Sequence, residues 1–94
     1  MKTALEQIEE LRQFKDGWDE PGDLAPRHDL LDSAVELLKQ KSIPRPRIIP
    51  TSQGFLCIDW TEGATYYVLR IERVDVGRLM ERYAGGTYFH TWTW

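Results

Sequence analysis

Three prolines within seven residues divide this sequence into two parts that must fold differently. Proline lacks the backbone N–H that a helix needs, and it pushes the residue before it toward extended conformations. Pro44 and Pro46 therefore exclude a helix at residues 43–47, where we expect a stiff connector. A short edge strand at Ile48-Ile49, ended by Pro50, is predicted to follow it.

Before the prolines, the sequence has the spacing of two amphipathic helices. The first carries one apolar residue about every turn, at Leu5, Ile8, Leu11 and Phe14. Thr3 and Glu6 have the spacing of a capping box at its start. Asp16-Gly17 is expected to end it, because glycine tolerates the left-handed conformation that closes a helix. The second helix is predicted over residues 27–41, with a broad apolar face made of Leu30, Leu31, Ala34, Val35, Leu37 and Leu38.

After the prolines, apolar and polar residues alternate as they do in strands. The segments with the clearest strand composition are residues 55–60, 65–73 and 87–94. Residues 78–83 contain good helix formers, but we favour a strand there, because Gly85-Gly86 is typical of a tight hairpin turn. The predicted fold class is α+β, with two N-terminal helices packed on one face of an antiparallel four- or five-stranded β-meander.

The charge is distributed unevenly over the 94 residues, which are enough for one domain at 1–94. The formal net charge is −3. The first 40 residues carry ten acidic and five basic residues, whereas residues 41–94 carry five acidic and seven basic residues. Nine of the eleven aromatic residues also lie in this second part. We therefore expect an acidic helical part at 1–41 and an aromatic, mildly basic sheet at 42–94.

The composition argues against several classes of protein. The single Cys57 excludes an intramolecular disulfide framework and a multi-cysteine zinc site. His28 and His90 lack the spacing of a metal-binding or nucleophilic motif. No apolar stretch approaches the length of a membrane span, and the N-terminus has no apolar region of the signal-peptide type. We expect a cytoplasmic protein with no catalytic residue, no metal and no cofactor.

The most polar segment is the loop at residues 16–26, with four carboxylates between 16 and 23. A calcium loop of the EF-hand type needs an oxygen ligand at its third position and a glutamate at its twelfth. This sequence has Trp18 and Arg27 there. Two interpretations of the loop remain. In one, Trp18 plugs the groove between the helices while Asp16 and Asp19 cap backbone amides; in the other, the loop contacts a partner.

If the helices cover one face of the sheet, the other face is rich in aromatic residues and arginine. The covered face would carry Leu56, Ile58, Trp60, Tyr67, Leu69 and Ile71. The opposite face would carry Phe55, Cys57, Asp59, Tyr66, Val68 and Arg70, then Met80, Arg82 and either Phe89 or the row Tyr88, His90, Trp92 and Trp94. Such residues are enriched at binding hot spots, but cross-strand aromatic pairs also stabilise an exposed sheet without a partner.

The segment around Gly17-Trp18-Asp19 resembles a group of short, largely uncharacterised bacterial and phage proteins. In that group an amphipathic helix leads into a Gly-Trp-Asp motif, a Pro/Gly loop, a second helix and a proline-containing connector. A strand that ends in an acidic residue and Trp follows, here Asp59-Trp60, and then an alternating strand, here residues 67–72. The resemblance spans residues 5–73, although Glu20-Pro21-Gly22 stands where a second glycine often follows the motif. It implies this order of elements and no activity.

The leading functional hypothesis is a small, non-enzymatic protein-binding module. Its most concrete form is a phage or mobile-element inhibitor of a host defence protein, similar to an anti-CRISPR, that acts by steric occlusion. An acidic helical part fits a larger host protein with a basic nucleic-acid-binding groove. The residues predicted to contact the partner are Trp18, Asp19, Glu20, Asp23, Tyr66, Arg70, Trp92 and Trp94.

Other hypotheses stay open beside this one. One is an antitoxin-like accessory protein. Another is single-stranded nucleic-acid binding through the aromatic and arginine-rich sheet face, against which the acidic net charge argues. A homodimer could form through Trp92 and Trp94 or through an open edge strand. We expect no contact with a membrane.

Overall fold

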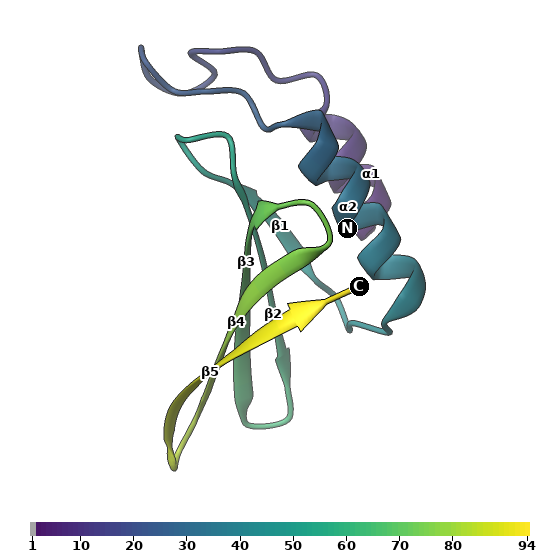
Figure 1. Ribbon diagram of the computed structural model, residues 1–94, viewed down its shortest axis with the longest axis vertical. Helices are drawn as coiled ribbons and strands as arrows, with labels where there is room; N and C mark the ends of the chain where they lie inside the picture. The colour runs from purple at the N-terminus through teal and green to yellow at the C-terminus, as the bar shows by residue number, and fades with distance from the viewer. Residues whose placement is uncertain (1) are drawn as a thin grey trace.

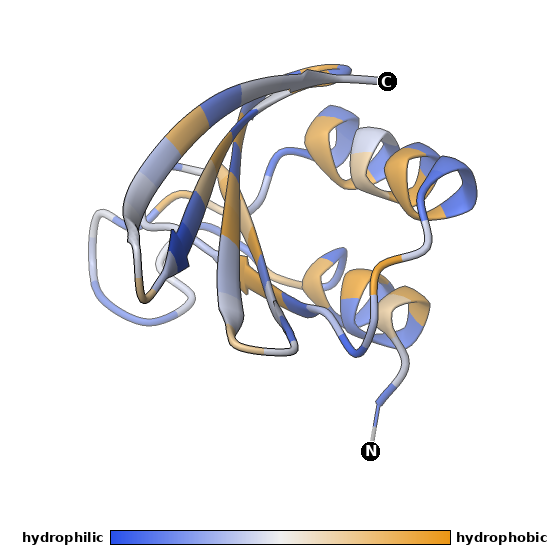
Figure 2. Ribbon diagram, turned by 90° about the horizontal axis from the view of Figure 1, so that it is seen from below, coloured by the Kyte–Doolittle hydropathy of each residue, from blue (hydrophilic) through white to orange (hydrophobic). Residues whose placement is uncertain are grey.

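The computed structural model describes residues 2–94, which form two helices and one sheet. The elements are α1 (Ala4–Leu11), α2 (His28–Gln40), β1 (Arg47–Pro50), β2 (Leu56–Glu62), β3 (Thr65–Arg73), β4 (Val76–Tyr83) and β5 (Gly86–Thr93). The five strands are antiparallel and lie in sequence order (Figure 1). Both helices lie on one side of the curved sheet (Figure 2). The predicted α+β fold, with N-terminal helices and an antiparallel meander, is confirmed.

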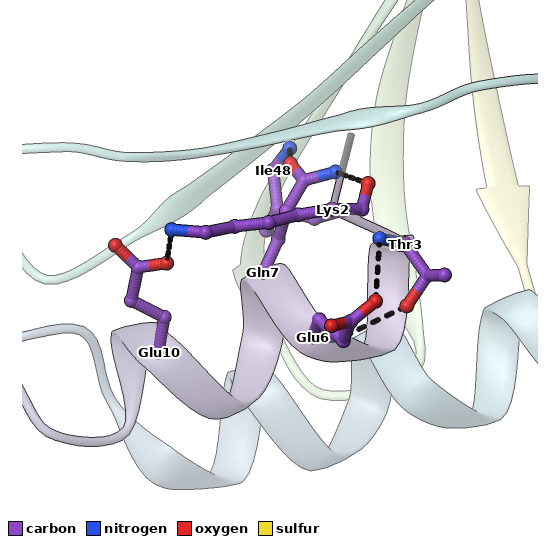
Figure 3. Close-up of polar contacts among 6 residues, drawn as sticks. All are labelled: Lys2, Thr3, Glu6, Gln7, Glu10 and Ile48. Carbon is purple, nitrogen blue, oxygen red and sulfur yellow. Dashed lines mark hydrogen bonds and ion pairs between the residues drawn. The ribbon is translucent and has the colours of Figure 1, made fainter.

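Helix α1 is shorter than predicted. It begins at the predicted capping box, in which Thr3 and Glu6 exchange hydrogen bonds of 3.1 and 3.2 Å (Figure 3). It ends at Leu11, because the amides of Gln13 and Phe14 bond to carbonyls three residues back instead of four. The apolar spacing continues through these tight turns, so the prediction that Asp16-Gly17 ends the helix is wrong.

The core fills the space between the helices and one face of the sheet. A row of buried apolar residues crosses the first four strands as direct partners: Ile48, Ile58, Leu69 and Leu79. The helices contribute buried residues to the same cluster, among them Ile8, Leu30, Leu31 and Leu37. The strand face predicted to be covered is therefore the face that packs on the helices.

Residues 78–83 belong to strand β4, as favoured from the sequence. The hairpin that follows turns at Ala84 and Gly85, one residue before the predicted Gly85-Gly86 pair. Gly86 is already paired with Tyr83 as the first residue of β5. This register fixes which side chains of β5 face the helices.

The β1 edge of the sheet is bonded to a side chain of α1. The backbone N–H of Ile48 donates to Oε1 of Gln7 at 2.8 Å (Figure 3), and Nε2 of Gln7 donates to the carbonyl of Pro46 at 3.0 Å. The Gln7 amide thus takes the place that a neighbouring strand would occupy. One side chain both docks α1 on the sheet and satisfies two backbone groups at its edge, the N–H of Ile48 and the carbonyl of Pro46.

We predict that Gln7→Ala lowers the free energy of unfolding by about 1–3 kcal/mol, because it leaves a half-buried donor and acceptor without partners. Urea unfolding followed by tryptophan fluorescence measures this change. Gln13→Ala, at an exposed position next to the same helix, is the matched control. Equal unfolding curves for the two variants would contradict the role given to Gln7.

Candidate functional site

The strand alternation leaves a second sheet face on the side away from both helices. Its side chains form three rows across the paired strands. We call it the open face, and its principal members are Arg47, Ile49, Cys57, Asp59, Tyr66, Val68, Arg70, Arg78, Met80, Arg82 and Phe89. Within residues 2–94, both helices lie on the other side of the sheet (Figure 2). Phe89 belongs to this face, whereas Tyr88, His90 and Trp92 share the side of the helices.

An ion pair with a hydrogen-bonded hydroxyl organises one end of the open face. Arg47 binds both oxygens of Asp59, with Nε–Oδ1 and Nη2–Oδ2 distances of 2.8 and 2.5 Å. The hydroxyl of Tyr66 donates to Oδ2 of Asp59 at 2.7 Å. Asp59 is only 3% exposed, so its charge depends on these partners. The bonds from Arg47, and secondarily from Tyr66, lower the pKa of Asp59 against the opposing effect of burial.

Positive charge is concentrated at the other end. Arg70 pairs with Glu72 at 2.9 Å and lies 5.7 Å from the ring of Phe55. Arg78 lies 5.3 Å from the ring of Phe89. Within residues 2–94, Arg78 forms no ion pair, and neither does Arg82, which lies at the opposite end of the face as the cross-strand partner of Tyr66. This end can therefore offer guanidinium groups to an acidic ligand.

An open groove of about 590 Å³ lies at this basic end. It is lined by Arg70, Glu72, Arg73, Val76, Gly77, Arg78, Phe89, His90 and Thr91. Three arginines stand against one glutamate, so the groove is positive although the chain is acidic. The pairing of β3 with β4 shifts register between Arg70 and Arg73, at the same place as the groove.

The acidic loop is held together by its own side chains. Trp18 packs on Phe14 with a ring separation of 5.3 Å, and its Nε1 donates to the carbonyl of Leu24 at 3.0 Å. Asp16 accepts from the amide of Ala25 at 2.9 Å, as predicted for a capping carboxylate. The second cap was assigned wrongly to Asp19.

Asp23 supplies that second cap, since its carboxylate accepts from the amide of Glu20 at 2.9 Å. The carboxylate of Asp23 thus caps an amide three residues before it. The composition of the loop does not show which of its carboxylates makes this bond. Asp19 and Glu20 are exposed, and within residues 2–94 their carboxylates form no ion pair.

The two C-terminal tryptophans pack within the chain. Nε1 of Trp94 donates to the carbonyl of Ser33 at 2.8 Å and contacts its hydroxyl at 3.1 Å. Trp92 lies 5.8 Å from Trp60, and the ammonium of Lys41 is 4.7 Å from its ring. Both tryptophans are half-buried and are tied to the helical side of the sheet.

The eight predicted contact residues therefore fall in three places. Tyr66 and Arg70 lie on the open face, and Trp92 and Trp94 lie on the helical side. Trp18, Asp19, Glu20 and Asp23 form the loop between the helices. Arg47, Arg73 and Arg78 were not among the predicted contacts. The sequence does contain a signal for them. Every lysine or arginine after Lys41 is an arginine, and arginine is enriched at protein interfaces, where lysine is depleted.

A comparison of the chain with family models, with curated proteins and with solved structures finds no match in any of the three. Among residues 2–94, no group of three or more His, Cys, Asp or Glu side chains is placed to hold a metal ion. Neither helix in this part of the chain is long and apolar enough to cross a membrane.

We predict that Asp59→Asn lowers the free energy of unfolding at neutral pH by about 1–3 kcal/mol, since the buried bonds to Arg47 and Tyr66 lose their charge. Because folding lowers the pKa of Asp59, its charge stabilises the fold above the unfolded pKa of about 3.9. That contribution is lost as the pH falls further. The difference between variant and wild type should shrink below about pH 4.

Urea unfolding over a pH series measures this difference. Asp19→Asn, which neutralises an exposed carboxylate, is the control and should leave the curves unchanged. A difference for Asp59→Asn that stays constant through acid pH would contradict the account.

Proposed function

We propose that this protein is a non-enzymatic binding module that docks on another protein through its open face and acts by covering the bound surface. The observation that carries the proposal is the mixture of side chains on that face. Arg78 and Arg82 flank the half-buried Met80, and the exposed Phe89 is its cross-strand partner. Arginine, methionine and aromatic residues are enriched in protein interfaces, where lysine is depleted.

The charge of the open face supports a partner that is acidic at the contact. The arginines of the basic groove would meet carboxylates there, with bidentate geometry available to Arg73 and Arg78, whereas Arg70 already pairs with Glu72. This differs from the basic partner groove expected from the composition of the helical part. Much of the acidity of the helices is matched internally: Arg12 pairs with Glu9 and Asp32, and Lys39 with Glu36.

A protein partner is favoured over single-stranded nucleic acid for two reasons. The chain as a whole carries a net charge of −3, which repels a phosphate backbone outside the groove. The centre of the open face is also apolar, with Val68 and Met80 paired directly between the arginine rows. A surface of this kind suits an inhibitor that works by steric occlusion, including the anti-CRISPR-like form of the hypothesis, because occlusion needs no catalytic group.

The exposed carboxylates of the loop support a second docking site for the same function. Asp19 and Glu20 stand beside Trp18, which is fixed by Phe14 and Leu24. A rigid turn with two such charges could contact a basic groove on a larger protein. If the open face binds the partner, reversing its arginine charges abolishes binding and reversing the loop carboxylates does not. If the loop binds the partner, the reverse holds, so one experiment distinguishes the two sites.

The experiment captures binding proteins from nuclease-treated bacterial lysate with three immobilised forms of the chain. These are the wild type, Arg78→Glu/Arg82→Glu and Asp19→Lys/Glu20→Lys. We expect the wild type and the loop variant to retain the same protein and the arginine variant to lose it, because its carboxylates would repel an acidic surface. Retention should weaken as salt is raised.

The controls distinguish loss of binding from loss of fold. All four substituted residues are exposed, so each variant should keep the wild-type circular dichroism. Capture lost only in the loop variant would move the site to residues 16–26. Salt-sensitive binding of a single-stranded oligonucleotide, abolished in the arginine variant, would replace the proposal by nucleic-acid binding.

A further inference from the structure

The two edges of the sheet differ in how their outward backbone groups are bonded. At β1, the Gln7 amide bonds the N–H of Ile48 and the carbonyl of Pro46, and Pro50 ends the strand. At the other edge, β5 pairs with β4 from Val76–Thr93 to Tyr83–Gly86 with no register shift. Within residues 2–94, no element lies beyond β5. An open edge of this length is a template for pairing with another strand.

Strand β5 also lacks the features that protect natural edges. Its eight residues, Gly86–Thr93, contain no proline, no lysine and no acidic residue. Phe89 is 59% exposed and Tyr88 is 47% exposed, and Phe89 is the most exposed large apolar side chain in residues 2–94. Edges are usually blunted by charge, proline or a bulge, so the edge of β5 is unprotected.

The hairpin geometry identifies which backbone groups face outward. A two-residue turn at Ala84 and Gly85 makes Tyr83 and Gly86 a hydrogen-bonded pair, and such pairs alternate along an antiparallel ladder. The outward N–H and C=O groups therefore belong to Thr87, Phe89, Thr91 and Thr93. The side chains of Thr87, Phe89 and Thr91 lie on the open face.

We propose that β5 pairs antiparallel with β5 of a second copy of this chain, about a two-fold axis between the two Phe89 residues. In the sequence Thr87-Tyr88-Phe89-His90-Thr91, the two threonines are placed symmetrically about Phe89, and Tyr88 would lie opposite His90 of the second copy. Thr87 then lies opposite Thr91 of the second copy, and Phe89 lies opposite Phe89. Threonine pairs and aromatic pairs at these positions are among the favourable cross-strand contacts.

The charges near this edge permit the pairing. Arg82 and Arg78 are the β4 partners of Thr87 and Thr91. In the dimer, Arg78 of one copy and Arg82 of the other would be separated by three strand spacings, about 14 Å. That distance exceeds the Debye length of about 8–10 Å in physiological salt. The two-fold axis is perpendicular to the sheet, so the two open faces would lie on the same side of a ten-stranded sheet.

The test is the mass in solution, measured by light scattering over a concentration series. The wild type should reach twice the chain mass of 11.0 kDa. Thr91→Pro should remain at the single mass, because it removes one outward N–H and adds a ring where the second strand would lie. Thr91→Val keeps the N–H and should dimerise. A wild type at the single mass throughout, or a folded Thr91→Pro dimer, would overturn the proposal.

A second pair of variants tests the same contact without a change in the backbone. Phe89→Lys places two ammonium groups opposite each other and removes the aromatic pair, so association should weaken roughly tenfold or more. Leu5→Lys also replaces an exposed apolar side chain by lysine, on α1 at a position 52% exposed, and should dimerise like the wild type. Equal dimerisation of Phe89→Lys and Leu5→Lys would also overturn it. Because the readout needs no partner protein, this result is independent of the function of the open face.

Discussion

The packing of two short helices on one face of the sheet is the interaction on which the rest of this structure depends. Side chains of a strand alternate between faces, so burying one row commits the next row to the opposite side. The row Ile48, Ile58, Leu69 and Leu79 lies under the helices. The same registers place Arg78, Met80 and Phe89 on the open face. The packing of the core therefore also determines that these side chains lie together on the open face.

The charged side chains are paired to different extents on the two sides of the molecule. The helical part holds most of the acidic residues, but Arg12, Lys39 and the backbone N–H of Thr3 bind four of their carboxylates, those of Glu9, Asp32, Glu36 and Glu6. The sheet has fewer charges, and those of Arg78 and Arg82 are left without an acidic partner in the part of the chain that the structure describes. The available charge is therefore positive at the site, although the chain is acidic overall.

The element order and the strand faces could be predicted because they depend on local period, as in residues 65–73. Three features could not. The apolar spacing up to Phe14 does not distinguish an α-helix from the tight turns that follow Leu11. The face on which Phe89 lies depends on the register between β4 and β5, and a shift of the hairpin turn by one residue changes that register. The bonds of Gln7 join groups 39 and 41 residues apart, which no local pattern encodes.

The central claim is that the open face is the surface that binds a protein. The most direct measurement is methyl NMR of the chain titrated with the protein that it captures. The account predicts that Val68 and Met80, at the centre of that face, change their shifts at low ratios of partner, while Leu30 and Leu37 on the buried side of α2 do not. Changes confined to Leu24, in the acidic loop, with Val68 and Met80 unaffected, would contradict it.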